Sequence, residues 1–246
     1  MTALEFHGVR VRLGRGRQAK EIVRGVDLEV PSGTVVGLVG ESGCGKSTLA
    51  RSAVGLVPLA AGHVVPGRRR AVQLVFQDPY SSLDPRMTVG AAITEALPRR
   101  RLFARPSARP PGAAAAEVAR FLDLVGLEAA HAQRLPGHLS GGQRQRVALA
   151  RALAARPEVV IADEITSALD VSVQGMVLNL VKDIQRELGL TLLFISHNLA
   201  VVRYVSDRVA VMSEGRVVEE GPVDEVMGSP RDPYTRTLLE SVPRLR

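Results

Sequence analysis

Tryptophan is absent from the 246-residue chain, cysteine occurs once, and aromatic residues make up only 3%. A single cysteine cannot form an internal disulfide, which suits a reducing cytosol. Gly, Pro or polar residues interrupt every long apolar stretch, so no segment is predicted to span a bilayer. The start of the chain, Met1 to Glu5, lacks a basic region followed by an apolar stretch. We therefore expect no signal peptide.

The scarcity of aromatic rings also bears on the basic charge of the chain. The formal net charge is +7, and many arginines cluster within residues 10–24 and 99–109. A single-strand nucleic-acid binder needs rings on which bases stack, and few are present here. We expect no nucleic acid partner. The favoured interpretation is an arginine-rich proteome together with a basic face near anionic lipid or a partner protein.

One glycine-rich segment indicates nucleotide chemistry. The run Gly40-Glu-Ser-Gly-Cys-Gly-Lys46-Ser47 fills every fixed position of the pattern G-x-x-x-x-G-K-[ST]. Its glycines allow the backbone N–H groups of residues 41 to 46 to point at a β-phosphate. The Lys46 ammonium then reaches the β- and γ-phosphates, and the Ser47 hydroxyl sits on Mg²⁺. The flanking sequence predicts a buried strand over Val35–Val39 and a helix over Ser47–Val54, with Gly55 as its C-terminal cap. That order places a phosphate at a helix N-terminus.

The rest of the chain divides by its hydrophobic pattern. Residues 4–30 alternate as half-exposed antiparallel strands with a turn at 14–17, and a further apolar run covers Val72–Phe76. Residues 78–156 are predicted to be mostly helical, with an amphipathic helix over Glu117–Val125 and a Pro- and Arg-rich break from Pro98 to Gly112.

Strands return near the end of the chain. They are predicted at Val159–Ala162 and Leu192–Ser196, with a helix from about Val173 to Leu188 between them. This alternation predicts a parallel sheet with right-handed crossovers. Val209–Met212 and Arg216–Glu219 are predicted to form a terminal hairpin.

Two acids end the strand that begins at Val159. Because successive side chains on a strand point in opposite directions, Asp163 can face Mg²⁺ while Glu164 faces a water beside the γ-phosphate. One carboxylate then supports the metal, and the other accepts a proton from the water. This pair predicts phosphate hydrolysis.

The order of these motifs resembles the nucleotide-binding domain of ATP-binding cassette (ABC) transporters, over nearly the whole chain. The stretches that carry the resemblance are Gly40–Thr48, Val75–Asp78, Leu139-Ser-Gly-Gly-Gln143, Ala162–Glu164, Ser167–Asp170 and Ser196-His197. Within them, the candidate nucleotide-binding residues are Gly40, Glu41, Ser42, Gly43, Cys44, Gly45, Lys46, Ser47, Thr48, Ser140, Gly141, Gly142, Gln143 and Asp170.

A narrower likeness is to the ATPases of dipeptide, oligopeptide and nickel importers. The segments that carry it are Phe76–Arg86, Ser167–Val173, Asp232-Pro-Tyr-Thr-Arg-Thr-Leu-Leu239 and Val242-Pro-Arg244. This likeness implies uptake of a peptide-like solute, with nickel or another small solute as the alternative.

The resemblance implies one α/β domain over residues 1–246. It comprises a P-loop NTPase (RecA-like) core with an antiparallel β-subdomain over 1–77 and 157–228, an inserted helical subdomain over 78–156, and a short C-terminal extension over 229–246. The cofactors implied are ATP and Mg²⁺. The implied location is peripheral, on the cytoplasmic side of the membrane. The implied partners are a second ABC ATPase subunit, identical or related, two permease subunits and, indirectly, a solute-binding protein.

Residue roles carry over from the same resemblance. Gln77 would contact Mg²⁺ and the attacking water, and His197 would hold the γ-phosphate. Together with Glu164 they form the expected catalytic set, and Ser47, Gln77 and Asp163 form the expected metal set. Ser140, Gly141 and Gly142 offer a hydroxyl and N–H groups at a helix start, a site that closes over ATP held by the second subunit. Asp170 would touch that subunit, and the segment Asp78–Arg86 would face the permeases.

Two positions depart from the family pattern. Ile165 stands where a proline usually follows Glu164, and the missing proline is expected to loosen the backbone of the base. The usual adenine-stacking aromatic is missing near Val11–Leu13. The adenine contact is then weaker, or it is made by Phe6 or by the turn holding Arg15 and Arg17.

Two further functions stay open on the sequence alone. A cytosolic ABC protein in translation or DNA repair usually carries two cassettes or a long coiled coil, whereas this chain has one cassette and no heptad run. The other is a partner subunit that binds nucleotide but hydrolyses it weakly. This possibility is suggested by Ile165, which stands in place of the usual proline.

Overall fold

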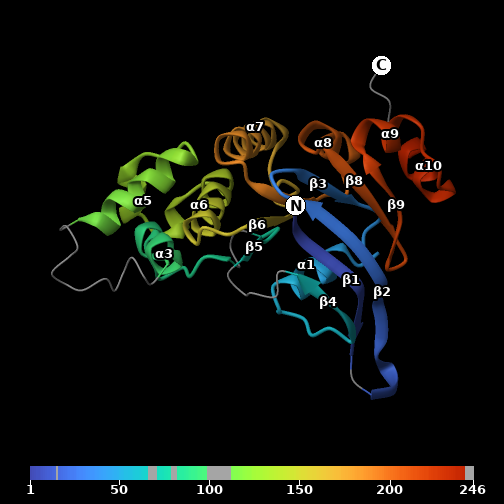
Figure 1. Ribbon diagram of the computed structural model, residues 1–246. Coiled ribbons are helices and arrows are strands. Elements are labelled where there is room, and N and C mark those ends of the chain that lie inside the picture. The colour runs from blue at the N-terminus through green and yellow to red at the C-terminus, as the bar shows by residue number, and fades with distance from the viewer. Residues whose placement is uncertain (15, 66–70, 79–81, 99–111, 242–246) are drawn as a thin grey trace.

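The computed structural model describes residues 1–14, 16–65, 71–78, 82–98 and 112–241. Their strands form two sheets, visible in Figure 1 as a crossed pair. The larger sheet has the order β5-β6-β7-β3-β8-β9, and the smaller has the order β2-β1-β4. The strands of the larger sheet are β3 (Val35–Val39), β5 (Val72–Val75), β6 (Val159–Asp163), β7 (Thr191–Ile195), β8 (Arg208–Ser213) and β9 (Arg216–Pro222).

The larger sheet confirms the predicted parallel core. β3 lies between β7 and β8 and is parallel to both, and β5, β6 and β7 continue in parallel. Only β9 runs antiparallel, because it returns from β8 through a tight turn at Glu214 and Gly215. Both turn residues have positive φ, 45° and 84°, as a hairpin turn that follows the strand twist requires. The predicted terminal hairpin is therefore present.

Alternation along the parallel strands divides the interior into two cores. On β3, Val35 and Val39 pack with the helices on one face, while Val36 and Leu38 pack toward the small sheet on the other. Both faces of a parallel sheet are covered, which explains its nearly continuous apolar strands. Gly37 lies beneath helix α8 (Leu199–Val205), where a Cβ would come within 2.3 Å of a Val202 methyl carbon.

The small sheet confirms the antiparallel strands predicted for residues 4–30. β1 (Thr2–Leu13) pairs with β2 (Lys20–Pro31) and, on its other edge, with β4 (Ala61–Val65). β4 was not predicted, since it is mostly exposed and contains Gly62, which weakens any strand signal. Its pairing with β1 decides its structure.

The helices between β5 and β6 lie at the left of Figure 1. There α3 (Val89–Ala96) and α5 (Ala113–Leu124) pack with α6 (Gly141–Ala154), and α6 in turn packs on β5. Most of the predicted Glu117–Val125 helix is present, but α5 begins four residues earlier. The Pro- and Arg-rich break predicted from Pro98 to Gly112 lies almost entirely outside the described residues.

The remaining helices cover the sheet or its ends. α1 (Lys46–Ala53) packs on β1, β2, β5 and β6, and α7 (Val171–Leu188) and α8 cover the opposite face (Figure 1). α9 (Val223–Gly228) and α10 (Pro233–Glu240) follow β9. α1 begins one residue before the predicted helix, and Gly55 adopts the predicted left-handed conformation after it, with φ 73°. Within the described residues, no helix has the length and apolar character needed to cross a membrane.

Candidate active site

The glycine-rich segment forms the loop between β3 and α1. Gly45, the residue before α1, has φ 114°, a conformation that L side chains rarely adopt. A Cβ there would lie 3.0 Å from the Met212 terminal methyl and 3.1 Å from the Ile22 carbonyl oxygen. Gly40 is tighter still, since its Cβ would come within 2.0 Å of the Met212 carbonyl oxygen. Met212 of strand β8 therefore leaves little or no room for a side chain at Gly40 or Gly45, the two ends of the loop.

The start of α1 is open to an anion. Among the described residues, no side chain caps this helix, and none of the backbone acceptors takes the N–H groups of Gly45, Lys46 or Ser47. Such unpaired groups, together with the helix dipole, attract a phosphate. The local geometry fits the predicted nucleotide.

Lys46 spans the inside of the loop. Its side-chain ammonium donates to the carbonyl oxygens of Gly40 and Glu41, both at 2.8 Å, and the residue is only 4% exposed. A buried ammonium needs such acceptors. A phosphate in the loop would offer this ammonium a stronger, charged partner than either carbonyl.

Two N–H groups of the loop correct the sequence prediction that residues 41 to 46 all point inward. The Glu41 N–H donates outward to the phenol oxygen of Tyr234 at 3.0 Å, and the Cys44 N–H donates to the Glu41 carbonyl at 3.3 Å. The Cys44–Glu41 bond closes a tight turn within the loop and the Glu41 N–H is taken by Tyr234, so both groups already have partners.

The predicted metal ligands Ser47 and Asp163 lie together. The Ser47 hydroxyl donates to Asp163 Oδ1 at 2.9 Å, across the gap between α1 and the end of β6. Burial raises the pKa of Asp163, and the hydrogen bond from Ser47 acts in the opposite direction. Hydroxyl and carboxylate oxygens are the hard ligands that Mg²⁺ takes alongside phosphate oxygens. The residues present therefore fit the ion.

Glu164 follows Asp163 in a left-handed conformation, with φ 50°. Its N–H donates to the Ile195 carbonyl at 3.0 Å, and its carbonyl accepts from the N–H and hydroxyl of Ser167 at 3.1 and 2.9 Å. Ile165 beside it is 2% exposed and packs in the core. These bonds and the buried side chain restrain the backbone in the absence of a proline, and the expectation that Ile165 loosens Glu164 stays a prediction.

The other two predicted catalytic residues lie around Glu164. His197 Nδ1 is 3.4 Å from Glu164 Oε2, and the His197 side chain remains 53% exposed. Gln77 donates through its amide to the Ser167 hydroxyl at 3.1 Å, and that hydroxyl in turn bonds the Glu164 carbonyl. The fold thus brings residues 77, 164 and 197 together at the carboxyl ends of the parallel strands β5, β6 and β7.

The Leu139–Gln143 segment starts α6. Ser140 accepts from the Gln143 N–H at 3.2 Å, and Gln143 Oε1 accepts from the Ser140 N–H at 3.0 Å. This reciprocal capping box fixes the segment without any ligand. The Gln143 amide nitrogen also lies 3.4 Å from Nε2 of His131, a buried residue that the sequence analysis did not single out. Ser140 itself is exposed.

Asp170 has a local role in the fold. Its carboxylate accepts from the Ser172 hydroxyl at 2.7 Å and from the Val173 N–H at 2.9 Å, which caps α7. The hydrogen bond from Ser172 holds the pKa of Asp170 below its ordinary value. The cap explains why α7 begins two residues before the predicted helix. A contact with a second subunit stays a prediction.

The residues considered for contact with adenine differ in their exposure. Phe6 is 1% exposed inside the second core, so the proposal that it contacts adenine is wrong. Leu13 is 42% exposed at the end of β1. Arg15 and the Arg17 side chain lie outside the described residues. Beside the loop opens a cleft of about 570 Å³ whose lining includes Ile22, Cys44 and Tyr234.

Comparison with known proteins identifies the family. Residues 23–167 match the model described as ABC transporter, and residues 218–246 match that of the oligopeptide/dipeptide transporter C-terminal region. The chain belongs to the ABC transporter ATP-binding family. This cassette is 46% identical to a putative peptide import ATP-binding protein of Brucella abortus (strain 2308), over 94% of its own length and 72% of the relative. It is 44% identical to the oligopeptide transport ATP-binding protein OppF of Bacillus subtilis (strain 168), over 98% and 82%.

Solved cassettes share the fold of this one. A dimeric ATP-binding cassette in a post-hydrolysis state, bound to ADP and Pi, matches with a TM-score of 0.76 and 27% identity over 89% of this chain and 98% of that one. The cbiO1 protein from Clostridium perfringens, part of the cbiONQ transporter complex, matches with a TM-score of 0.78 and 25% identity over 99% and 96%. The predicted ABC ATPase fold is confirmed. The chain is an ATP-binding ATPase of this family.

Proposed function

We propose that this cassette hydrolyses ATP with Glu164 as the general base and powers import of a peptide-like solute. The observation that carries the hydrolytic part is the Glu164–His197 pair, 3.4 Å apart, beside the Ser47–Asp163 hydrogen bond of 2.9 Å. The carboxylate of Glu164 accepts a proton from the attacking water, and His197 orients that carboxylate and contacts the γ-phosphate. Lys46 and the start of α1 hold the β- and γ-phosphates.

Ser47 and Asp163 would hold Mg²⁺, with Gln77 on the side of the attacking water. When bound, the ion would neutralise negative charge on the phosphates. The remaining residues of the site keep their roles from the sequence analysis, with Ser140 to Gln143 acting on ATP bound by a second cassette.

Replacing Glu164 by Gln tests the base directly. Shape is retained and the proton acceptor is lost, so turnover should fall about 10²-fold or more while ATP affinity stays within about twofold. Glu158→Gln is the matched control, since Glu158 is exposed just before the same strand, and its turnover should equal that of the wild type. Steady-state ATPase assays with and without EDTA, together with calorimetric ATP-analogue binding, provide the readouts. Full turnover in the Glu164 variant would remove this residue from the role.

The import function draws support from two sources. Two relatives of this chain are named as a putative peptide import ATP-binding protein and an oligopeptide transport ATP-binding protein. The end of the chain also matches the oligopeptide/dipeptide C-terminal region. We infer a peripheral position on the cytoplasmic side of the membrane, in a dimer with an identical or related cassette and beneath two permeases served by a solute-binding protein.

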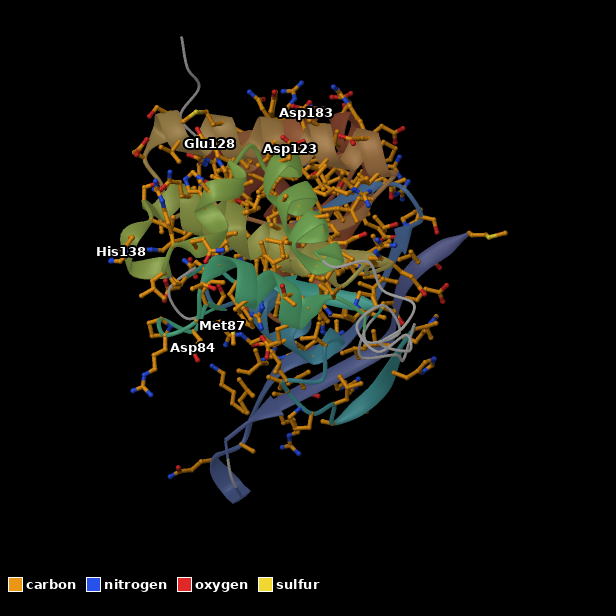
Figure 2. The ribbon with its side chains drawn as sticks, turned by 90° about the vertical axis from the view of Figure 1, so that its left-hand side faces the viewer. Asp84, Met87, Asp123, Glu128, His138 and Asp183 are labelled. Atoms are coloured by element: carbon orange, nitrogen blue, oxygen red, sulfur yellow. The ribbon has the colours of Figure 1, made fainter. Side chains whose placement is uncertain are left out.

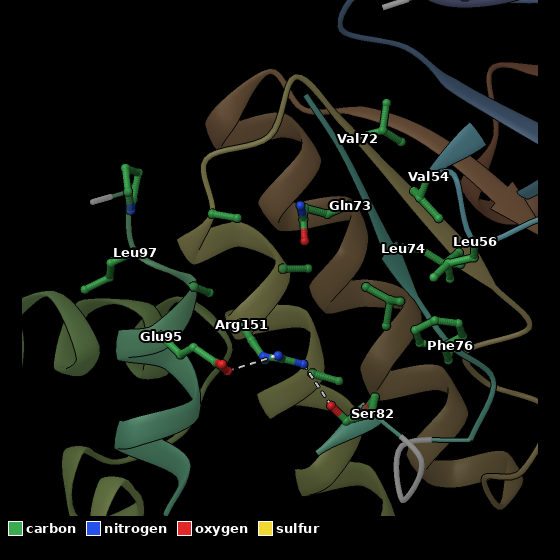
Figure 3. Close-up of a pocket in the computed structure, with 16 residues that line it drawn as sticks. Val54, Leu56, Val72, Gln73, Leu74, Phe76, Ser82, Glu95, Leu97 and Arg151 are labelled. Carbon is green, nitrogen blue, oxygen red and sulfur yellow. Dashed lines mark hydrogen bonds and ion pairs between the residues drawn. The ribbon is translucent and has the colours of Figure 1, made fainter. Parts of the chain in front are cut away.

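A groove suits the permease contact. It has a volume of about 590 Å³ and lies between β5 and helices α3 and α6. Leu74 and Phe76 line one side and Leu97 the other (Figure 3). Arg151 bonds the Ser82 carbonyl at 2.9 Å and Glu95 at 3.2 Å. Ser82 belongs to the Asp78–Arg86 segment predicted to face the permeases, of which residues 79–81 lie outside the described part.

Figure 2 shows the exterior of this helical region. Asp84 and Met87 lie along its lower edge, and His138, just before the Leu139–Gln143 segment, lies at its left rim. Asp84 of the Asp78–Arg86 segment and Ser140 of the Leu139–Gln143 segment are exposed, which leaves both segments accessible to a partner chain at these positions.

Arg151→Ala tests the groove. Losing both bonds should free the Ser82 segment and lower co-purification with the permeases at least about threefold, since charged hydrogen bonds of this kind contribute about 1.5–3 kcal/mol. Cassette-only ATP binding should not change. Arg156→Ala is the control, because Arg156, just beyond the C-terminal end of α6, also pairs with a glutamate, Glu117 at 3.1 Å, and does not line the groove. Equal permease recovery in both variants would place the contact elsewhere. Recovery with ribosomes or DNA in place of permeases would favour the non-transport function.

A further inference from the structure

Tyr234 reaches the phosphate loop from the far end of the chain. It is the second residue of α10, and its hydroxyl accepts the N–H of Glu41, 193 positions earlier, at 3.0 Å. The residue lines the cleft beside the loop together with Glu41 and Cys44. It belongs to the Asp232–Leu239 segment, which resembles the importer ATPases and has no role in the proposed hydrolysis of ATP.

The peptide unit between Gly40 and Glu41 is held from both sides. Its carbonyl, on Gly40, accepts from the Lys46 ammonium at 2.8 Å inside the loop. Its N–H, on Glu41, donates to Tyr234 outside the loop. Because the two ends of a trans peptide point in opposite directions, the two bonds together define the orientation of this plane.

The Tyr234 side of this clamp is anchored independently of the loop. The N–H groups of Tyr234 and Thr235 donate to Asp232, at 2.8 and 3.4 Å, and so cap α10. Glu219 of β9 accepts the N–H groups of Arg231 and Asp232 at 2.8 and 3.1 Å. Thr235 is 1% exposed. The start of α10 is therefore fixed to β9, and the phenol is brought to the loop by the C-terminal segment.

The two bonds respond differently to nucleotide. The Lys46 ammonium has three N–H donors and gives two of them to the carbonyl oxygens of Gly40 and Glu41, so contacting both the β- and γ-phosphates requires it to give up at least one of these bonds. The bond from the Glu41 N–H to Tyr234 requires no such exchange. Burial raises the pKa of Tyr234, so the phenol stays neutral near pH 7 and keeps its hydrogen-bonding capacity.

We propose that Tyr234 is a positioning residue for ATP: its hydroxyl holds the Gly40–Glu41 peptide in the orientation that the nucleotide-bound loop needs, and thereby couples the C-terminal segment to the phosphate loop. The residue touches the loop and not the reacting atoms. Its contribution concerns binding and loop geometry, and the proton transfer at Glu164 is unaffected.

Tyr234→Phe is the test, because it removes the hydroxyl and keeps the ring. Loss of one neutral hydrogen bond should raise the KM for ATP and the Kd for a non-hydrolysable analogue about threefold to tenfold, with kcat changed less than about twofold. The matched control is Tyr204→Phe, whose hydroxyl bonds Asn179 on α7, and its KM should equal that of the wild type. A fall in kcat alone, or an unchanged KM in the Tyr234 variant, would overturn the proposal.

The absence of tryptophan gives a second readout. The chain has three tyrosines, Tyr80, Tyr204 and Tyr234. In a Tyr80→Phe, Tyr204→Phe background, tyrosine emission reports Tyr234 alone. Titration with the ATP analogue should change this emission with the same Kd as calorimetry. A flat signal at saturating nucleotide, with binding intact, would mean that the phenol does not sense the loop.

Discussion

The two helix starts that carry nucleotide motifs, those of α1 and α6, are built in opposite ways. α1 begins after a glycine with φ 114° and has no side-chain cap among the described residues. α6 begins after Ser140 in an extended conformation and is closed by a full capping box with Gln143. Within the part of the chain that the structure describes, the start of α1 leaves its N–H groups without side-chain partners, next to Lys46. At the start of α6, the N–H groups of Ser140 and Gln143 are bonded within the capping box.

The two helix starts would therefore contact a phosphate in different ways. The loop before α1 is held by two Lys46 bonds to its own carbonyl oxygens, and a phosphate would compete with these oxygens for the ammonium. The capping box before α6 forms without a ligand, and within the described residues the exposed Ser140 hydroxyl accepts but does not donate a hydrogen bond, so its proton is available to a partner. A preformed surface of this kind suits an ATP molecule that arrives bound to another subunit.

The largest effect is expected from a substitution in the loop before α1. Lys46→Ala removes the charge that neutralises the phosphates, so affinity for a non-hydrolysable ATP analogue should fall about a hundredfold. Isothermal titration measures it. Lys182→Ala is the control, since Lys182 on α7 donates to the Tyr204 carbonyl at 2.9 Å and should leave affinity unchanged. Near-native affinity in the Lys46 variant would contradict the assignment of the loop.

A pair of glycine substitutions sharpens the comparison. Gly45→Ala forces a side chain into a left-handed backbone and against Met212, so the free energy of unfolding should drop about 1–3 kcal/mol. Gly141→Ala meets only Leu169, at an ordinary 3.6 Å, and should be neutral or stabilising by up to about 1 kcal/mol. Urea unfolding of both variants gives the values. Equal losses would mean that the two helix starts are equally strained.

The smallest effect concerns the α6 side. Ser140→Ala should lower the free energy of unfolding by about 1 kcal/mol through the lost cap. It should also lower turnover about tenfold through the lost contact with partner ATP, without changing ATP binding by a single cassette. Thr88→Ala removes the corresponding cap of α3, which accepts the Ala91 N–H at 3.3 Å, and should reproduce the stability loss alone. Identical turnover in the two variants would leave Ser140 with a structural role only.

Local patterns predicted what depends on neighbouring residues. The apolar runs at Val35 and Val159 identified parallel strands, and the glycine spacing at Gly40 identified the phosphate loop, because strand burial and loop conformation have short-range signals. The parts that were missed depend on distant chain segments. β4 forms on the edge of β1, and His131 meets Gln143 only after α6 has packed.

The two departures from the family pattern show the same division. The sequence predicted a loosened Glu164 from the absence of proline at 165, because backbone freedom is judged locally. In the fold, the Ile195 carbonyl and Ser167 hold this backbone, and Ile165 is buried. Phe6 looked available for adenine, yet its place on the inner face of β1 buries it.

By itself, then, the sequence determined that this chain binds a nucleotide and how its strands and helices alternate, since spacing and periodicity are local properties of the chain. The tertiary structure decided which groups meet: Ser47 with Asp163, His197 with Glu164, and Tyr234 with Glu41. Those contacts join residues far apart in the chain. They exist because the sheet order places the ends of β3, β6 and β7 side by side and because β9 carries α10 back to the loop.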